Sequence, residues 1–148
     1  MTLNDILSAL TTANLSVTIK NATDDVITFT SGGYQGVESD ILARTVAAWS
    51  VTGRNVVIEM ERQTGTLTLS ANTVSLASIG ATDTVSITAH TGEVSAVSSD
   101  EEIAKVYING DTITVEEVAA GTAMILVTSA ATGDYEAATA TIAVTCTE

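Results

Sequence analysis

The sequence contains no proline, one cysteine, one histidine and few aromatic residues, which make up 3% of its 148 positions. The single cysteine, Cys146, excludes an intramolecular disulfide framework, and no Cys or Cys/His cluster has metal-ligand spacing. Basic residues are also scarce: five Lys and Arg stand against 18 Asp and Glu, so the formal net charge is −13. Because such a chain repels phosphate backbones and anionic membrane surfaces, we expect no nucleic-acid or lipid partner.

Long hydrophobic runs are missing as well. The N-terminus, from Met1 to Asp5, shows no basic region followed by an apolar stretch, so we expect neither a secretory signal nor a membrane insertion. The chain also shows no nucleophile paired with a base, no paired-acid signature, no metal cluster and no phosphate-binding loop. We therefore expect no enzymatic activity, no catalytic residue, no cofactor and no bound metal.

The composition changes near Gln63. Residues 1–63 hold seven acidic and four basic side chains, whereas residues 64–148 hold eleven acidic side chains and one basic residue, Lys105. The two parts carry net charges of −3 and −10, which together account for the −13 of the chain. The second part is also rich in Thr, Ser, Ala and Val. We therefore predict two small domains, 1–63 and 64–148, in a protein that is mainly β.

The first 63 residues are typical of a small α+β unit. Thr2 can cap a helix over residues 3–10, whose Leu and Ile positions form one apolar stripe. Alternating apolar and polar residues predict two hairpins, one pairing 15–20 with 26–30 and the other pairing 46–51 with 55–61. One or two helical turns are expected within residues 37–42.

From Thr64 onward, short alternating runs are separated by Gly, Asp and Ser clusters. They predict seven or eight strands at 66–70, 74–76, 84–89, 94–98, 103–108, 112–116, 123–129 and 138–145. So many short strands in so few residues suit a two-layer antiparallel β-sandwich with Greek-key connections. The small side chains imply a thin core of Val, Ile and Ala.

Several motifs of this second part occur together in a known family. They are Thr-Leu-Thr-Leu-Ser at 66–70, Val-Ser-Ile-Thr-Ala at 85–89, Ser98-Ser99-Asp100 followed by Ile103-Ala104-Lys105-Val106, the run 110–115, and the run 121–127. On these residues, 66–145 resembles the bacterial immunoglobulin-like group 2 domain, which is found in surface adhesins and in phage head and tail proteins. The tryptophan usual before the paired serines is replaced here by Ala96 and Val97. The resemblance implies an Ig-like sandwich that binds, spaces or decorates.

Residues 1–60 are similar to short α+β proteins encoded in phages and mobile elements of Gram-positive bacteria, through residues 3–10, 42–46 and 56–59. Together the two resemblances imply a bacteriophage virion accessory or structural protein, a capsid decoration or tail component assembled in the host cytoplasm and released by lysis. Its partners would be capsid or tail proteins, with 1–63 as the attachment or homo-oligomerisation domain. The alternative is an adhesion module whose sandwich loops bind carbohydrate on the host-cell surface.

Four aromatic residues are candidates for partner contact: Tyr34, Trp49, Tyr107 and Tyr135. Trp49 alternates with Val51 on one strand, and we expect it to pack in the core, with partner contact as the competing interpretation. Tyr34 lies in a Gly-rich segment that lacks the strand, helix and Lys of a phosphate-binding loop. Tyr107 and Tyr135 are candidates for sugar stacking.

The charged and titratable candidates have simpler interpretations. We expect His90 to be exposed where a strand ends, because no nucleophile or further ligand accompanies it. The acidic runs 100–102 and 116–117, with Asp111 and Asp134 in other turns, are expected to face water. The alternative is that these carboxylates converge to bind Ca²⁺.

Overall fold

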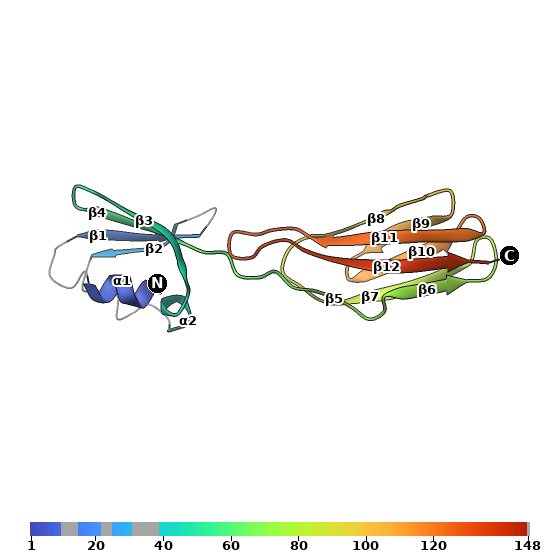
Figure 1. The fold of residues 1–148 in the computed structure, drawn as a ribbon, viewed down its shortest axis with the longest axis horizontal. Coiled ribbons are helices and arrows are strands. Elements are labelled where there is room, and N and C mark those ends of the chain that lie inside the picture. The colour runs from blue at the N-terminus through green and yellow to red at the C-terminus, as the bar shows by residue number, and fades with distance from the viewer. Residues whose placement is uncertain (10–14, 22–24, 31–38, 148) are drawn as a thin grey trace. The chain divides into compact units, whose positions relative to one another are not determined.

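The computed structural model describes residues 1–9, 15–21, 25–30 and 39–147, and the protein is mainly β (Figure 1). The chain divides into two compact units, Met1–Gln63 and Thr64–Glu148. Each is treated by itself below, as the first and the second unit. Within the described ranges, no helix is both long enough and apolar enough to cross a membrane.

The first unit combines helices with a four-stranded sheet. Its elements are α1 (Leu3–Ala9), β1 (Ser16–Lys20), β2 (Asp25–Thr30), α2 (Ser39–Leu42), β3 (Val46–Thr52) and β4 (Asn55–Met60). The strand order is β2-β1-β4-β3, with β1 and β4 parallel and the other two pairs antiparallel. Both expected hairpins are present, as β1–β2 and β3–β4. Leu10, the expected last residue of the first helix, lies outside the described residues. So do residues 31–38, which include the start of the helical turns expected within 37–42.

Helix α1 is held by a capping box. The Thr2 N–H donates to Asp5 Oδ2 at 2.8 Å, and the Asp5 N–H donates to Thr2 Oγ1 at 3.3 Å. Hydrogen bonds from the backbone and side chain of Thr2 lower the pKa of the Asp5 carboxyl. The helix lies against one face of the sheet (Figure 1). Its apolar stripe and the facing strands form the core: Leu3, Ile6, Leu7, Val17, Ile19, Val56, Ile58 and Met60.

The second unit consists of two four-stranded sheets. One has the order β5-β7-β10-β9, from β5 (Leu67–Leu69), β7 (Thr82–His90), β10 (Thr112–Glu117) and β9 (Ala104–Asn109). The other has the order β6-β12-β11-β8, from β6 (Thr73–Leu76), β12 (Ala138–Cys146), β11 (Gly121–Ser129) and β8 (Val94–Ser98). All neighbours are antiparallel except β6 and β12. Alternate residues of both sheets form one core of mainly Val, Ile and Ala, which makes the unit sandwich-like.

The Ser98-Ser99-Asp100 motif forms hydrogen bonds that stabilise the connection from β8 to β9. Ser99 N–H donates to the Met124 carbonyl at 2.8 Å, and Ser99 Oγ accepts from the Met124 N–H at 2.9 Å. Ser98 Oγ accepts from the Asp100 N–H at 3.2 Å, and Asp100 Oδ1 accepts from the Glu102 N–H at 2.9 Å. Ser99 therefore fastens this turn to the neighbouring strand β11, and Ser98 holds the backbone of the turn itself.

The connection from β7 to β8 depends on close backbone packing at Gly92. The Gly92 N–H donates to the fully buried Ser129 Oγ at 2.9 Å. The Ala130 N–H donates to the Glu93 carbonyl at 2.8 Å. A Cβ atom added at position 92 would overlap the carbonyl of Ala130, whose atoms are backbone and cannot turn away. Only glycine fits at this point.

Gly92→Ala is therefore expected to destabilise the second unit by about 1–3 kcal/mol, the usual cost of forcing extra volume into a packed site. Urea unfolding followed through exposure of the buried Cys146 thiol reports on this unit. Ser95→Ala, at an exposed position of β8, is the control and should unfold at the wild-type midpoint. If Gly92→Ala and Ser95→Ala unfold at the same urea concentration, the backbone at position 92 moves without loss of stability, which contradicts this account.

Candidate functional site

Trp49 is exposed, and the expectation that it packs in the core is wrong. Its side chain is 53% exposed and that of Val51 is 50% exposed. In the β3–β4 ladder Trp49 pairs with Ile58 and Val51 with Val56, so both point to the sheet face on which Ile58 and Val56 are buried. The fully buried side chains described in this unit come from α1, β1 and β4, and β3 contributes none. The apolar face of the sheet thus continues onto β3 beyond the core.

Residues 47–52 lie on the last strand of the sheet that the structure describes, and we call them the β3 edge. The strand is last in the sheet and pairs with β4 on one side. At the beginning of the strand, the Val46 N–H donates to the Met1 carbonyl at 3.1 Å, and Thr2 bridges to Thr45. Within the described residues, no strand covers the rest of this side. All six residues of the β3 edge are exposed.

A second apolar surface lies on the outer face of the sheet β6-β12-β11-β8. Val97, Met124 and Leu126 are 62%, 50% and 48% exposed, and Val97 pairs with Leu126 across β8 and β11. We call these three residues the outer patch. A depression of about 390 Å³ is lined by them together with Ser98, Ser99 and Thr141. Sequence reasoning missed this surface, although the unbroken apolar run 123–127 signals a strand with apolar residues on both faces.

The tyrosine candidates do not form one site among the described residues. Tyr34 lies outside them. Tyr107 is 52% exposed on β9, and its hydroxyl donates to Glu116 Oε2 at 3.0 Å. This hydrogen bond to the Glu116 carboxylate raises the pKa of Tyr107. Tyr135 lies between β11 and β12, where its N–H donates to Thr132 Oγ1 at 3.1 Å.

His90 connects two turns through its two ring nitrogens. Its Nδ1 lies 2.7 Å from the Gly92 carbonyl oxygen, which only a protonated Nδ1 can approach as a donor. Its Nε2 lies 3.3 Å from Asp111 Oδ1 in the β9–β10 turn. A general base needs a nucleophile at its free nitrogen, and here that nitrogen faces a carboxylate. The side chain is 39% exposed, so it is only partly covered at the end of β7.

The expectation that the acidic runs face water is wrong for Glu117, which is 1% exposed. Its Oε2 accepts from the Ser78 N–H at 3.1 Å, while Oε1 has no hydrogen-bond partner among the described residues. Burial, followed by the nearby charge of Glu117, raises the pKa of the Cys146 thiol. In the described part of the chain, no three His, Cys, Asp or Glu side chains gather closely enough to hold a metal ion.

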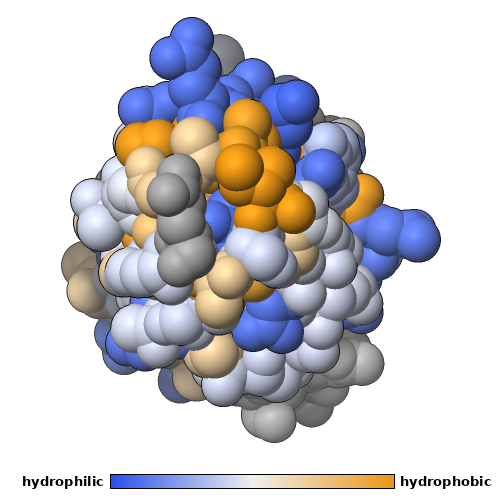
Figure 2. Space-filling view, turned by 90° about the vertical axis from the view of Figure 1, so that its right-hand side faces the viewer, coloured by the Kyte–Doolittle hydropathy of each residue, from blue (hydrophilic) through white to orange (hydrophobic). Residues whose placement is uncertain are grey.

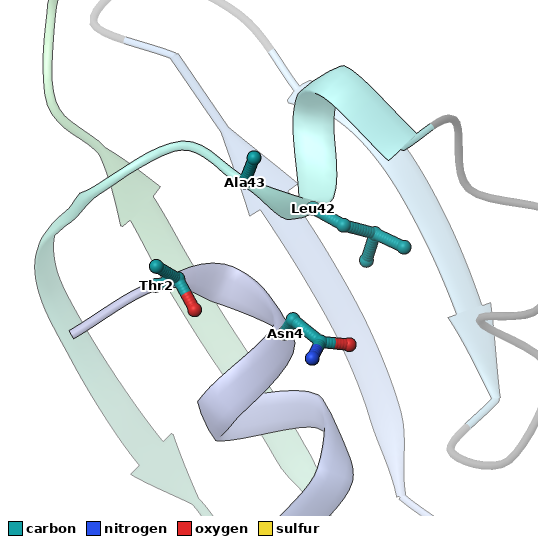
Figure 3. Close-up of a pocket in the computed structure, with 4 residues that line it drawn as sticks. All are labelled: Thr2, Asn4, Leu42 and Ala43. Carbon is teal, nitrogen blue, oxygen red and sulfur yellow. The ribbon is translucent and has the colours of Figure 1, made fainter.

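Two other surfaces offer little chemistry. A depression of about 320 Å³ in the first unit lies between the start of α1 and the end of α2, lined by Thr2, Asn4, Leu42 and Ala43 (Figure 3). None of these side chains titrates. At the end of the second unit where the C-terminus lies, apolar atoms form a small area among polar ones (Figure 2). The β6–β7 turn lies at this end, because β6 runs beside β12, and carries Ile79, which is 68% exposed.

Comparisons with known proteins add little to this geometry. No protein-family model matches the chain, and no curated protein matches it. Among solved structures it is similar to the crystal structure of domains 4 and 5 of the S-layer protein SbsC, with a TM-score of 0.47 and 22% sequence identity. The match covers 63% of this chain and 57% of the S-layer chain.

The Tyr107–Glu116 hydrogen bond gives a titration that can be measured. Because the pKa of Tyr107 is raised in the folded protein, the bond stabilises fully below the ordinary tyrosine pKa, and its contribution is lost as the pH rises through the raised value. Spectrophotometric titration should show one tyrosine ionising late, and Glu116→Gln should return it to the ordinary range. Asp111→Asn should leave the curve unchanged. Identical curves for wild type and Glu116→Gln would contradict the assignment.

Glu117 should act as a buried acceptor whose charge is not needed. Glu117→Ala leaves the Ser78 N–H without its acceptor and is expected to cost about 1–3 kcal/mol. Glu117→Gln keeps an oxygen for that N–H and removes a buried charge, so it should stay within about 1 kcal/mol of wild type. Urea unfolding at neutral pH compares the two variants. If Gln is as damaging as Ala, the charge itself is required and this account is wrong.

Proposed function

We propose that the chain is a non-enzymatic accessory or structural protein of a bacteriophage virion, a capsid decoration or a tail component. In this proposal residues 1–63 attach to capsid or tail proteins, and residues 64–148 form an Ig-like domain displayed outward. The observation that carries the proposal is the combination in one chain of a sandwich with Ig-like strand order and a first unit whose uncharged strand β3 exposes Trp49.

The strand order of the second unit supports the Ig-like part of the proposal. Immunoglobulin sandwiches place strands A, B, E and D in one sheet and C, F and G in the other. The order β5-β7-β10-β9 follows A-B-E-D, and β8-β11-β12 follows C-F-G. The paired serines of the group 2 resemblance lie at the end of β8, where Ser99 fastens the turn to β11.

The distribution of charge supports the division of roles. Residues 64–148 carry a net charge of −10, which keeps displayed domains soluble and apart. Residues 46–52 of the first unit carry no charge and expose Trp49, a residue type enriched at the centres of protein interfaces. Attachment through the first unit and display of the second is the arrangement these features favour.

Carbohydrate binding by the second unit is the alternative function. The specific observation in its favour is Tyr107, whose ring is 52% exposed and can offer a face for a sugar. A glycan array probed with the full chain and with Tyr107→Ala tests this role. Binding that disappears in the variant would favour the adhesion module over the virion component.

Co-sedimentation with particles of the parent phage tests the virion role. The full chain should pellet with particles, and so should a chain in which residues 64–148 are replaced by an unrelated soluble domain. Residues 64–148 alone should stay in the supernatant. If residues 64–148 pellet and the replaced chain does not, the roles of the two units are reversed. If nothing pellets with heads or tails, the virion proposal fails.

A further inference from the structure

The sequence holds a single Asn-Gly pair, Asn109-Gly110, and the structure exposes both residues. Asn109 is the last residue of β9, and Gly110 and Asp111 form the turn to β10. An asparagine side chain reacts most readily with its own backbone when glycine follows, because glycine has no Cβ to shield its nitrogen. The pair therefore places a reactive amide beside an accessible nucleophile.

The turn that carries this pair holds only two residues. Asn109 pairs with Thr112 at the end of the β9–β10 ladder, which leaves Gly110 and Asp111 as the loop. Gly110 has a φ of +57°, and Asp111 does not have a positive φ. Glycine with a positive φ at the first loop position is the pattern of a type II′ hairpin turn. A Cβ built on Gly110 would meet no atom within 4 Å, so this side of the turn is open.

The two halves of the turn differ in how they are held. The Asp111 carbonyl accepts from the Ile87 N–H at 2.8 Å, and Asp111 Oδ1 lies 3.3 Å from His90 Nε2. Among the described residues, no hydrogen bond engages the Asn109 side chain or the Gly110 N–H. The reacting groups therefore belong to the half that no neighbour holds.

We propose that Asn109 is a site of spontaneous modification, at which the folded protein converts this side-chain amide without an enzyme. The Gly110 backbone nitrogen attacks Asn109 Cγ and loses its proton, which passes through water to the departing amide nitrogen. The bond from Cγ to that nitrogen breaks, ammonia leaves, and a cyclic imide remains. Water then opens the imide at either carbonyl, which gives aspartate or isoaspartate at position 109.

The reaction needs only a local opening of the hairpin. Attack requires rotation about ψ of Asn109, and this rotation breaks the pairing of Asn109 with Thr112. That pair is the last of its ladder, so it can open while Ile108 stays paired with Ile113. Openings at the end of an element require much less free energy than global unfolding. The modification therefore proceeds from the folded protein.

Both products change this end of the second unit. Aspartate adds a negative charge next to Asp111, in a unit that already carries −10. Isoaspartate adds a methylene to the main chain, which a two-residue turn in fixed register cannot absorb. We expect the contacts of Asp111 with Ile87 and His90 to loosen in the isoaspartate form.

Two other exposed asparagines serve as internal controls. Asn55 is the first residue of β4, and Asn72 directly precedes β6. They are followed by Val56 and Thr73, whose β-branched side chains shield the backbone nitrogen. If exposure alone decided the reaction, these asparagines and Asn109 would react alike.

The experiment is incubation of the purified full chain at mildly alkaline pH, followed over time by ion-exchange chromatography and by peptide mapping with mass spectrometry. We expect a more acidic form to accumulate, with aspartate and isoaspartate in the peptide that contains position 109. The peptides that contain Asn55 and Asn72 should stay unmodified over the same period. Equal modification of all three peptides would overturn the inference, because Gly110 would then have no part in it.

A variant and an unfolded reference complete the test. Asn109→Gln keeps the amide on a longer side chain, which disfavours ring closure, so the acidic form should be lost. Because position 109 is exposed, this variant should unfold at the wild-type urea midpoint. The same incubation in urea shows how fast the unfolded chain reacts. A wild-type protein that reacts at position 109 only in urea would overturn the inference, because the folded turn would then protect the amide.

Hydrogen exchange of the separated isoaspartate form measures the structural consequence. The Ile87 amide should exchange faster than in the unmodified protein, because its acceptor lies in the modified turn. The amide of Ile142, on β12 in the other sheet, is the control and should not change. Unchanged exchange at Ile87 would contradict the expected loosening of the turn.

Discussion

In the described part of the first unit, α1 is the helix that contributes fully buried side chains to the core, whereas Ile41 and Leu42 of α2 are only partly buried against a four-stranded sheet. A helix with its side chains is about 10 Å wide, and neighbouring strands are about 4.8 Å apart, so one helix covers about two strands. Helix α1 (Leu3–Ala9) buries the apolar residues of β1 and β4, and the next strand outward is β3. The exposure of Trp49 and Val51 follows directly, because their strand continues the apolar face past the width of the helix.

In the second unit, the apolar faces are covered because two sheets pack face to face. Each of its sheets covers the inner face of the other, so Ile113, Ile125 and Ile142 are fully buried with no helix needed. Small core residues require close backbone approaches, and Gly92 beside Ala130 is one of them. Polar groups inside are few and mostly hydrogen-bonded, as at Ser129 and on one oxygen of Glu117. Strands β6, β12, β11 and β8 carry no charged residue, so the outer face of their sheet is uncharged. The outer patch lies on this face.

Much of the secondary structure could be predicted from the sequence, because alternation of apolar and polar residues is a local property. The strands expected at 94–98, 112–116 and 138–145 occur within one residue of those bounds, and the composition break at Gln63 coincides with the boundary between the compact units. The candidate surfaces could not be predicted in the same way. Whether Trp49 is covered depends on how far α1 reaches across the sheet, and whether Glu117 is buried depends on how the β6–β7 turn folds over it. Both depend on contacts between distant parts of the chain.

The central proposal is that the first unit attaches to particles through its exposed strand β3, and backbone hydrogen exchange of the full chain, with and without particles of the parent phage, tests it most directly. The account predicts that amides within residues 47–52 exchange more slowly when particles are present, because attachment covers them. Amides of β8, residues 94–98, should exchange at the same rate in both samples. Exchange within 47–52 that particles do not change would contradict the account.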